Sequence, residues 1–230
     1  MRLLAIETST ELGSCALWQN GQVVERYCPA GRPHSETLLP LVQALMAENG
    51  LATRQLDAIA FGAGPGAFTG LRVACGIAQG LAVAAELPVI PVGTLEALAW
   101  RAGVKRCLAV LDARVGEVYW GRFERLESGL ALRGAIHLSA PEAVELPDAA
   151  EGWQIAGNAL LAYPFLAKRS EAAGLPELPE VMPSAGAVAT LAVPRFAAGE
   201  AVDPAKAAPL YVRDKVAKTV AERLAAGGKA

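Results

Sequence analysis

Charged and aromatic side chains are scarce in this sequence. Charged residues occupy 19% of its 230 positions and aromatic residues 6%, whereas 53% are hydrophobic. A typical domain is about one quarter charged, and a chain this apolar has enough surface to bury, which excludes disorder as its main state. The 21 lysine and arginine residues face 23 aspartate and glutamate residues. The sequence therefore lacks the basic excess of a free-standing nucleic-acid-binding protein.

Metal ligands and membrane anchors are also missing from the pattern. The sequence has two histidines, and none of its four cysteines forms a Cys-x-x-Cys pair, which argues against a zinc site. The first apolar run stops at Glu7, too early for a signal peptide. The most apolar stretch, residues 71–85, is interrupted by Arg72 and Gln79 and is too short to cross a bilayer. We therefore expect a soluble, reduced, cytoplasmic protein without membrane contact.

Hydrophobic periodicity predicts two similar halves. Each half opens with three strands, the first ending in an acid, and continues with strands and helices. The predicted strands are residues 3–7, 14–19, 23–28, 57–61, 89–92, 107–112, 116–123, 130–138 and 153–156. The predicted helices are residues 35–49, 70–85, 94–102, 158–168 and 184–197. From residue 204 we expect an irregular tail, with residues 210–212 docked.

This duplicated pattern predicts the fold class. A three-stranded meander followed by strand–helix units gives a mixed sheet covered by helices. Two such units form the plan of the α/β actin-like (ASKHA) fold, a duplicated ribonuclease-H-like architecture. We expect two lobes, residues 1–103 and residues 104–230, with the second lobe reduced.

Turn and cap residues refine the prediction. Asn20 and Gly21 separate two strands and predict a two-residue hairpin, because both positions of that turn need positive φ. Ser35, Thr69 and Thr94 precede or open apolar helical stretches, and we expect each of them to cap its helix.

The glycine-rich turn at residues 62–70 is the most specific local feature. Its first six residues match the dinucleotide fingerprint G-x-G-x-x-A formally. The next strand, however, ends in Val92-Gly93-Thr94 and supplies no acid for a ribose hydroxyl, which disfavours a nicotinamide or flavin site. Two interpretations remain open. The turn could hold an anion at a helix N-terminus, or its glycines could allow tight turning and close packing, which we favour slightly.

The acids at the strand ends suggest a vestigial nucleotide site. Thr8 and Ser9 follow Glu7 in one half, and Asp112 holds the equivalent place in the other. Thr8, Ser9 and Asp112 are the candidate nucleotide-binding residues. The alternative is that Asp112 forms a structural ion pair with Arg114, as strand-end acids commonly do. Because no nucleophile–base set or metal cluster is visible, we expect no catalytic residues and no intrinsic cofactor.

The helix at residues 70–85 is apolar on nearly every side, and glycine and alanine leave little bulk on several of its faces. Such a helix must be buried nearly all round, and one sheet covers only one side of it. This motivates an interface hypothesis in which it joins the helix at residues 35–49 to form a bundle with helices of a partner.

These segments together closely resemble a known family. The residues that carry the resemblance are Leu4-Ala5-Ile6-Glu7-Thr8-Ser9, His34-Ser35-Glu36 with Leu38-Leu39-Pro40, Gly64-Pro65-Gly66-Ala67-Phe68-Thr69-Gly70-Leu71-Arg72, Asp112-Ala113-Arg114 with Glu117-Val118-Tyr119, and Pro209-Leu210-Tyr211-Val212-Arg213. They are similar, essentially end to end, to the bacterial TsaB family, also called YeaZ. One departure is Glu7, where many members have aspartate.

The resemblance implies a non-catalytic partner of a larger paralogue, TsaD. TsaD transfers a threonylcarbamoyl group onto an adenine next to the tRNA anticodon, and the ATPase TsaE joins the pair. TsaD carries two metal-binding histidines one helical turn apart, whereas here His34 is followed by Leu38. The expected partners are therefore a TsaD-like paralogue in a heterodimer, a TsaE-like ATPase and, indirectly, tRNA, with a homodimer when the chain is alone. ATP or ADP is expected only at the level of the complex.

In this family the two helices form the bundle with TsaD. The expected interface residues are Leu38, Leu39, Val42, Leu45, Met46, Leu71, Arg72, Cys75, Ala78 and Gln79. Two other functions remain open: an independent ATPase of the actin-like fold, and a glycoprotease-like peptidase.

Overall fold

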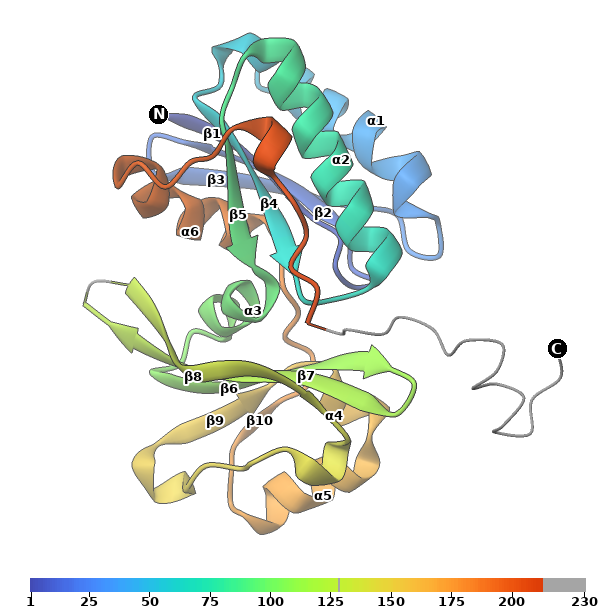
Figure 1. Ribbon diagram of the computed structural model, residues 1–230, viewed down its shortest axis with the longest axis vertical. Coiled ribbons are helices and arrows are strands. Elements are labelled where there is room, and N and C mark those ends of the chain that lie inside the picture. The colour runs from blue at the N-terminus through green and yellow to red at the C-terminus, as the bar shows by residue number, and fades with distance from the viewer. Residues whose placement is uncertain (128, 213–230) are drawn as a thin grey trace, which may run out of the picture.

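The computed structural model describes residues 1–127 and 129–212, which form two lobes, each built on a five-stranded sheet (Figure 1). Arg213 of the resemblance lies outside these residues. The first sheet has the order β3-β2-β1-β4-β5 and the second the order β10-β9-β6-β7-β8. The strands are β1 (Arg2–Glu7), β2 (Ser14–Gln19), β3 (Gln22–Tyr27), β4 (Ala58–Gly64), β5 (Val89–Gly93), β6 (Arg106–Arg114), β7 (Glu117–Leu126), β8 (Gly129–Ser139), β9 (Trp153–Ala156) and β10 (Glu177–Leu178).

The two sheets have the same topology, which confirms the duplicated fold. In the first, β1 pairs antiparallel with β2, β2 antiparallel with β3, and β1 parallel with β4, which pairs parallel with β5. In the second, β6, β7 and β8 form the antiparallel meander, and β9 and β10 add parallel strands beside β6. The hairpin between β2 and β3 is also confirmed, since Asn20 and Gly21 have φ values of 52° and 86°.

Helices cover both sheets. They are α1 (His34–Glu48), α2 (Phe68–Ala85), α3 (Thr94–Ala102), α4 (Ala159–Ala162), α5 (Pro164–Ala172) and α6 (Ala185–Ala197). Short 3₁₀ helices are η1 (Thr53–Gln55), η2 (Pro141–Ala143), η3 (Ala149–Glu151) and η4 (Pro204–Lys206). α1 and α2 cover one face of the first sheet, where Leu38 and Leu45 pack with Ile6 and Phe61 in a single core. α5 packs beneath the second sheet through Leu166.

The remaining helix of each half covers the sheet of the other half. α3 follows the first sheet along the chain, but its Leu95 and Leu98 pack with Leu111 of the second sheet. α6 follows the second sheet, and its Val188 and Ala192 lie in the core of the first sheet. Figure 1 shows α3 resting on the second sheet and α6 behind the first. The two lobes therefore exchange one covering helix each.

The packing of α3 and α6 cuts across the expected division into residues 1–103 and 104–230. Leu95 and Leu98 of α3 pack in the core of the second sheet while its Ala97 packs in that of the first, and α6 packs on the first sheet. The reason is that the central strands of the first sheet are apolar on both faces, with Leu3 and Ala5 on one side and Leu4 and Ile6 on the other. Since α1 and α2 cover only one face, α6 must supply the second layer.

The predicted helix caps are wrong. Ser35 and Thr69 lie inside the first turns of α1 and α2, and Thr94 is the first residue of α3. The N-cap positions are instead Pro33, Ala67 and Gly93, and no side-chain cap bond is formed at any of them. The hydroxyl of Thr94 is buried without a hydrogen-bond partner among the described residues.

Two further elements differ from the prediction. The expected helix at residues 158–168 is broken between α4 and α5, because Tyr163 leaves the helical conformation and Pro164 opens a new helix at its first position. The expected strand at residues 57–61 continues to Gly64, so part of the glycine-rich segment belongs to β4.

The length of α2 corrects the expectation that this apolar segment is too short to cross a bilayer. Its 18 residues are long and apolar enough to cross a membrane by length and composition alone. In the structure, Ala74, Ala78 and Ala82 pack in the core that includes Ile59 and Phe61 of β4. The small residues of α2 thus allow it to lie close to the sheet, as in a core helix of a globular domain.

Candidate functional site

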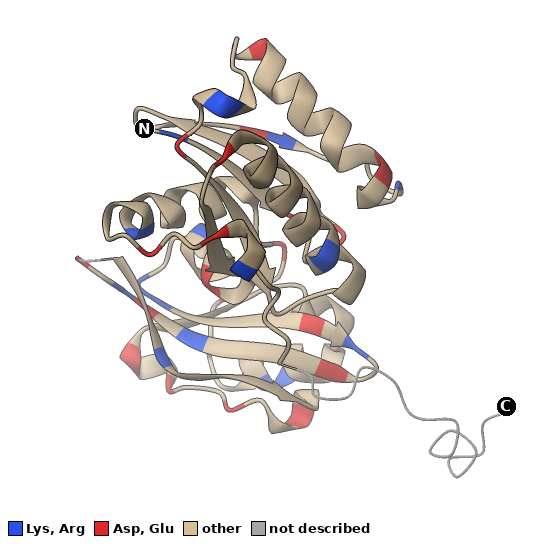
Figure 2. Cartoon of the chain, turned by 45° about the horizontal axis from the view of Figure 1, so that its top comes forward, with Lys and Arg blue, Asp and Glu red and all other residues tan. Residues whose placement is uncertain are grey.

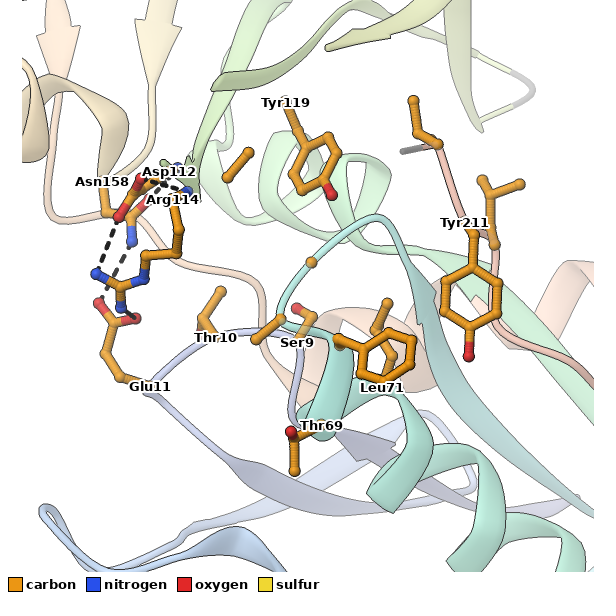
Figure 3. Close-up of a pocket in the computed structure, with 16 residues that line it drawn as sticks. Ser9, Thr10, Glu11, Thr69, Leu71, Asp112, Arg114, Tyr119, Asn158 and Tyr211 are labelled. Atoms are coloured by element: carbon orange, nitrogen blue, oxygen red, sulfur yellow. Dashed lines mark hydrogen bonds and ion pairs between the residues drawn. The ribbon is translucent and has the colours of Figure 1, made fainter. Parts of the chain in front are cut away.

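A cavity of about 290 Å³ opens between the two lobes (Figure 3). It is formed by the β1–β2 loop and the start of α2 in the first lobe, the β6–β7 turn and the start of α4 in the second, and the C-terminal segment. The lining residues are Ser9, Thr10, Glu11, Gly66, Ala67, Phe68, Thr69, Leu71, Asp112, Ala113, Arg114, Tyr119, Asn158, Leu210, Tyr211 and Val212. The cavity is thus where the two halves of the duplicated fold meet.

Asp112 is held tightly by its own lobe. Its carboxylate accepts the Arg114 N–H at 2.8 Å and the Tyr163 hydroxyl at 2.7 Å, and it pairs with Nη1 of Arg114 at 3.0 Å. Its N–H donates to Oδ1 of Asn158 at 2.9 Å. Burial, together with the hydrogen bond to Asp112, raises the pKa of Tyr163 to about 12. The structural ion pair that we considered as the alternative for Asp112 is therefore present.

Polar contacts join the lobes across the mouth of the cavity. Nδ2 of Asn158 donates to Oε1 of Glu11 at 3.3 Å, and Nη2 of Arg114 lies 4.0 Å from Oε2 of Glu11. Figure 3 shows these three side chains meeting at one side of the cavity. Because all three are solvent-accessible, these contacts contribute little to stability.

The first strand-end acid lies behind the cavity. Glu7 is fully buried, Oε1 accepts the Ser9 N–H at 2.5 Å, and burial raises the pKa of its carboxyl. The Thr8 hydroxyl donates to the Gly70 carbonyl at 2.8 Å. Of the three candidate nucleotide-binding residues, Ser9 and Asp112 therefore line one cavity, while the Thr8 hydroxyl is engaged with α2.

The glycines at the start of α2 allow the close packing that we favoured for this turn. A β-carbon on Gly66 would lie 2.6 Å from the Ser9 β-carbon, and one on Gly70 would overlap the Thr8 carbonyl oxygen. The β1–β2 loop thus packs directly against the backbone of the glycine-rich turn, which no larger residue would permit.

Most of the expected interface residues are not on the surface. Seven of the ten are buried within this chain. These are Leu38, Val42, Leu45, Met46, Leu71, Cys75 and Ala78. The physical reason is that the apolar stripe of a helix turns first toward its own sheet, and α1 and α2 share one core with β1 and β4. Leu39 and Arg72 are exposed, and Gln79 is partly buried.

The outward face of α1 and α2 is formed by other residues. Along α2 it presents Arg72, Gly76, Gly80 and Val83, and a β-carbon on either glycine would meet no other part of the described chain within 4 Å. Val83 is 65% exposed, and Leu39 of α1 is 37% exposed. Figure 2 shows that both helices are uncharged between their ends. We call these five residues the helix face. In the sequence, Gly76 and Gly80 were the signal for this helix face, but they were interpreted only as small residues.

The C-terminal segment lies along a side of α2 that adjoins the helix face. Nε2 of Gln79 donates to the carbonyls of Pro204 and Ala207, at 3.0 Å each. The Leu210 N–H donates to the Ala63 carbonyl at 2.6 Å, which confirms that residues 210–212 are docked. Residues 203–212 are called the strap from here on, and Figure 1 shows them crossing the first lobe toward the second.

The described residues contain no group of three or more histidine, cysteine, aspartate or glutamate side chains placed to hold a metal ion. Leu38, where the resemblance places the missing second histidine, is fully buried in the core. All four cysteines lie in the described part of the chain and are free and buried.

Comparison with known proteins gives consistent matches. The model of the family described as "TsaD: tRNA N6-adenosine threonylcarbamoyltransferase" matches residues 28–220. The chain is 39% identical over 229 residues to an Escherichia coli protein named tRNA threonylcarbamoyladenosine biosynthesis protein TsaB, covering 94% of this chain and 96% of the relative. It is 45% identical over 129 residues to the Haemophilus influenzae protein of the same name, covering 54% and 55%. The solved structure of YeaZ from Pseudomonas aeruginosa superposes with a TM-score of 0.82 at 39% identity, covering 92% and 99%.

Proposed function

This chain belongs to the TsaB family, and from that premise we propose that it is a non-catalytic subunit that binds and supports a TsaD-like paralogue in tRNA threonylcarbamoyladenosine synthesis. Its relatives are named for that biosynthesis. The family model that matches most of the chain is described as that of the transferase itself. A chain that shares the domain type of an enzyme, without a visible reaction centre, fits the role of a partner paralogue.

The observation that carries the proposal is the helix face. A surface on two neighbouring helices that carries one charged residue, Arg72, and two open glycines suits the close approach of helices from another chain. Leu39 and Val83 provide apolar contact at its edges. Because the TsaD-like paralogue is expected to have equivalent helices, the partner interface is a four-helix bundle formed by one helix pair from each chain.

The contacts of Asp112 in the cavity and the burial of Glu7 behind it support the non-catalytic role. The Asp112 carboxylate is engaged by Arg114 and Tyr163, and Glu7 is fully buried. A nucleotide-hydrolysing site needs an accessible acid that can orient water or a metal. In this proposal the chain has no intrinsic cofactor, any ATP or ADP belongs to the complex, tRNA is contacted indirectly, and the TsaE-like ATPase binds the assembled pair.

Reconstitution tests the proposal. The TsaD-like paralogue and the TsaE-like ATPase are incubated with tRNA, ATP and a threonylcarbamoyl donor, with and without this chain, and modified adenosine is quantified by mass spectrometry. We expect modification only when this chain is present. Unchanged modification in its absence would overturn the role. Pull-down with the tagged chain should recover the paralogue in equal amount.

The independent ATPase is the second candidate, favoured by the cavity between the lobes and its hydroxyl-bearing residues Ser9, Thr10 and Thr69. It predicts ATP binding and turnover by the isolated chain. The peptidase alternative predicts cleavage that is blocked by chelators or thiol reagents. Neither activity is expected for the isolated chain under the proposed function, so the same purified sample distinguishes all three.

A further inference from the structure

A second cavity, of about 310 Å³, is lined by residues of both lobes. Its volume lies at the lower end of the range for sites that bind small molecules, and a boundary between lobes is a common place for such sites. It shares one lining residue, Leu210 of the strap, with the cavity that holds Ser9 and Asp112. The second cavity is therefore a separate candidate site, outside the region that suggested a nucleotide.

The wall that the second lobe contributes is apolar. It includes Leu95 of α3, Phe123 of β7, and Leu132 and Ile136 of β8. Leu132 is 42% exposed, so part of this wall is not covered by the described chain. A molecule with an apolar body would remove this surface from water on binding, which is favourable.

The facing wall, from the first lobe, is formed largely by main chain. Gly64 and Gly93, at the ends of β4 and β5, line the cavity and carry no side chain that could project into it. A planar ring fits the space between an apolar wall and a backbone wall better than a bulky aliphatic group does, because its two faces are flat.

The charged residues of the lining form an ion pair between the two exchanged helices. Nη2 of Arg195 on α6 donates to Oε1 of Glu96 on α3 at 2.8 Å and to Oε2 at 2.6 Å. The Glu96 and Arg195 side chains are 16% and 27% exposed. Since the two charges neutralise each other, a charged ligand would lose its hydration without gaining a counter-charge. The cavity therefore favours an uncharged ligand.

This ion pair offers acceptors to the cavity. Arg195 is the donor to both oxygens of Glu96, no other donor to them lies in the described part of the chain, and each carboxylate oxygen can accept a further bond. The Nη1 atom of Arg195 donates to the Pro91 carbonyl at 2.9 Å. A β-carbon on Gly93 would lie 3.5 Å from Oε2 of Glu96. The glycine thus leaves free the space from which an N–H or O–H group can reach the carboxylate.

We propose that this cavity binds an uncharged aromatic molecule of one or two fused rings, which places its ring against Phe123, Leu132 and Ile136 and donates an N–H or O–H group to Glu96. The bound molecule contacts both lobes at once, because its two walls come from different lobes. The proposal concerns the isolated chain and stands whether or not the proposed function is correct.

Indole is the probe, and benzofuran, which has the same fused rings without an N–H, is the matched comparison. Each is titrated to about 10 mM into the full chain, with isoleucine and leucine methyl groups labelled for NMR. We expect indole to shift the methyl signals of Leu95, Leu132 and Ile136 with a Kd of about 1 mM or lower, while Leu45 in the core beneath α1 is unaffected. Benzofuran should bind at least about tenfold more weakly, because it cannot make the hydrogen bond to a charged acceptor.

Two outcomes of the titration would overturn the proposal. Unshifted cavity methyl groups at the highest indole concentration would mean that the cavity is not a site for this class of molecule. Equal affinities for indole and benzofuran would mean that Glu96 does not recognise a donor.

Two variants test the position of the bound ring. Leu132→Trp fills the cavity from a position that tolerates a larger side chain, and we expect indole to bind at least about tenfold more weakly. Leu126→Trp is the matched control, because Leu126 is 41% exposed in the same sheet and does not line the cavity. Gly93→Ala fits without overlap and should remove most of the preference for indole over benzofuran. Unchanged binding in Leu132→Trp, or an equal loss in Leu126→Trp, would contradict this site.

Discussion

The carboxyl group of Glu7 fills the space that a side chain at position 62 would need: a β-carbon on Gly62 would overlap Oε2 of Glu7. The two residues are neighbours on β1 and β4, next to the parallel pair Ile6 and Phe61. Oε1 accepts the Ser9 N–H, while Oε2 has no hydrogen-bond partner in the described part of the chain. The glycine thus makes room for an acid in an interior where its charged form is disfavoured.

The first prediction concerns pH. Burial raises the folded-state pKa of Glu7 above its unfolded value of about 4.3, so the folded state retains a proton that the unfolded state loses. This contribution to stability is therefore greatest below the unfolded pKa and falls as pH rises toward the folded pKa, by about 1.4 kcal/mol for each pH unit between the two pKa values. Glu7→Gln removes the dependence. Urea unfolding from pH 4 to pH 9 should show the variant gaining stability relative to the parent as pH rises; a constant difference would contradict a raised pKa.

The second prediction compares two glycine-to-alanine changes. Gly62→Ala forces the new methyl group onto Glu7, and we expect a loss of roughly 1–3 kcal/mol in unfolding free energy. Gly76→Ala places the same methyl group in open space on a helix and should stabilise by about 0.5–1 kcal/mol. Chemical denaturation of both variants measures the contrast. Similar effects of the two substitutions on the unfolding free energy would show that contact of the new methyl group with Glu7 does not destabilise the protein.

The third prediction concerns tyrosine ionisation. Because burial and the hydrogen bond to Asp112 raise the pKa of Tyr163 to about 12, its hydroxyl should remain a donor when an exposed tyrosine has ionised near pH 10. Burial also raises the pKa of Tyr27, so an absorbance titration at alkaline pH should contain a late part that loses the contribution of one tyrosine in Tyr163→Phe. Titration of all four tyrosines in one step near pH 10 would contradict the clamp on Asp112.

The fourth prediction locates the partner surface. Val83→Arg puts a charge on the helix face, and we expect the affinity for the TsaD-like paralogue to fall at least about tenfold, or about 1.4 kcal/mol, with no loss of stability since Val83 is exposed. Val115→Arg is the matched control, because Val115 is 85% exposed on the β6–β7 turn of the other lobe. Calorimetry or surface binding measures both variants. Equal losses in the two would argue against the helix face as the interface.

The strands and the duplicated topology could be predicted from the sequence because their signals are local. Short apolar runs and the Asn20-Gly21 turn are properties of adjacent residues, and they place β1, β2 and β3 almost without error. The location of α6 could not be predicted in this way. Its apolar positions, such as Val188 and Ala192, reveal that one side is buried but not which sheet buries it.

In the candidate site, too, the sequence predicts local features but not the contacts that depend on packing. The stripe containing Leu38 and Cys75 was correctly recognised as needing cover, but periodicity cannot tell a chain's own sheet from a partner. Gln79 interrupts an apolar helix and looks like a surface residue, yet its amide holds the strap more than 100 residues away in sequence. Thr8 and Asp112 stand out in the sequence as polar residues that follow apolar runs. Their hydrogen bonds to Gly70 and Tyr163 depend on the packed structure.

The exchange of α3 and α6 has a consequence for recombining lobes between related chains. A cut after residue 103 would leave the first sheet without α6 and would carry α3 away from the sheet that it covers. A hybrid joined at that point would therefore pair each parent's sheet with a covering helix of the other parent, across cores where Leu95 and Val188 have no room for a mismatch. Exchange of a lobe between related chains should succeed only when each sheet and the helix that covers it come from the same parent, although that helix lies in the other half of the sequence.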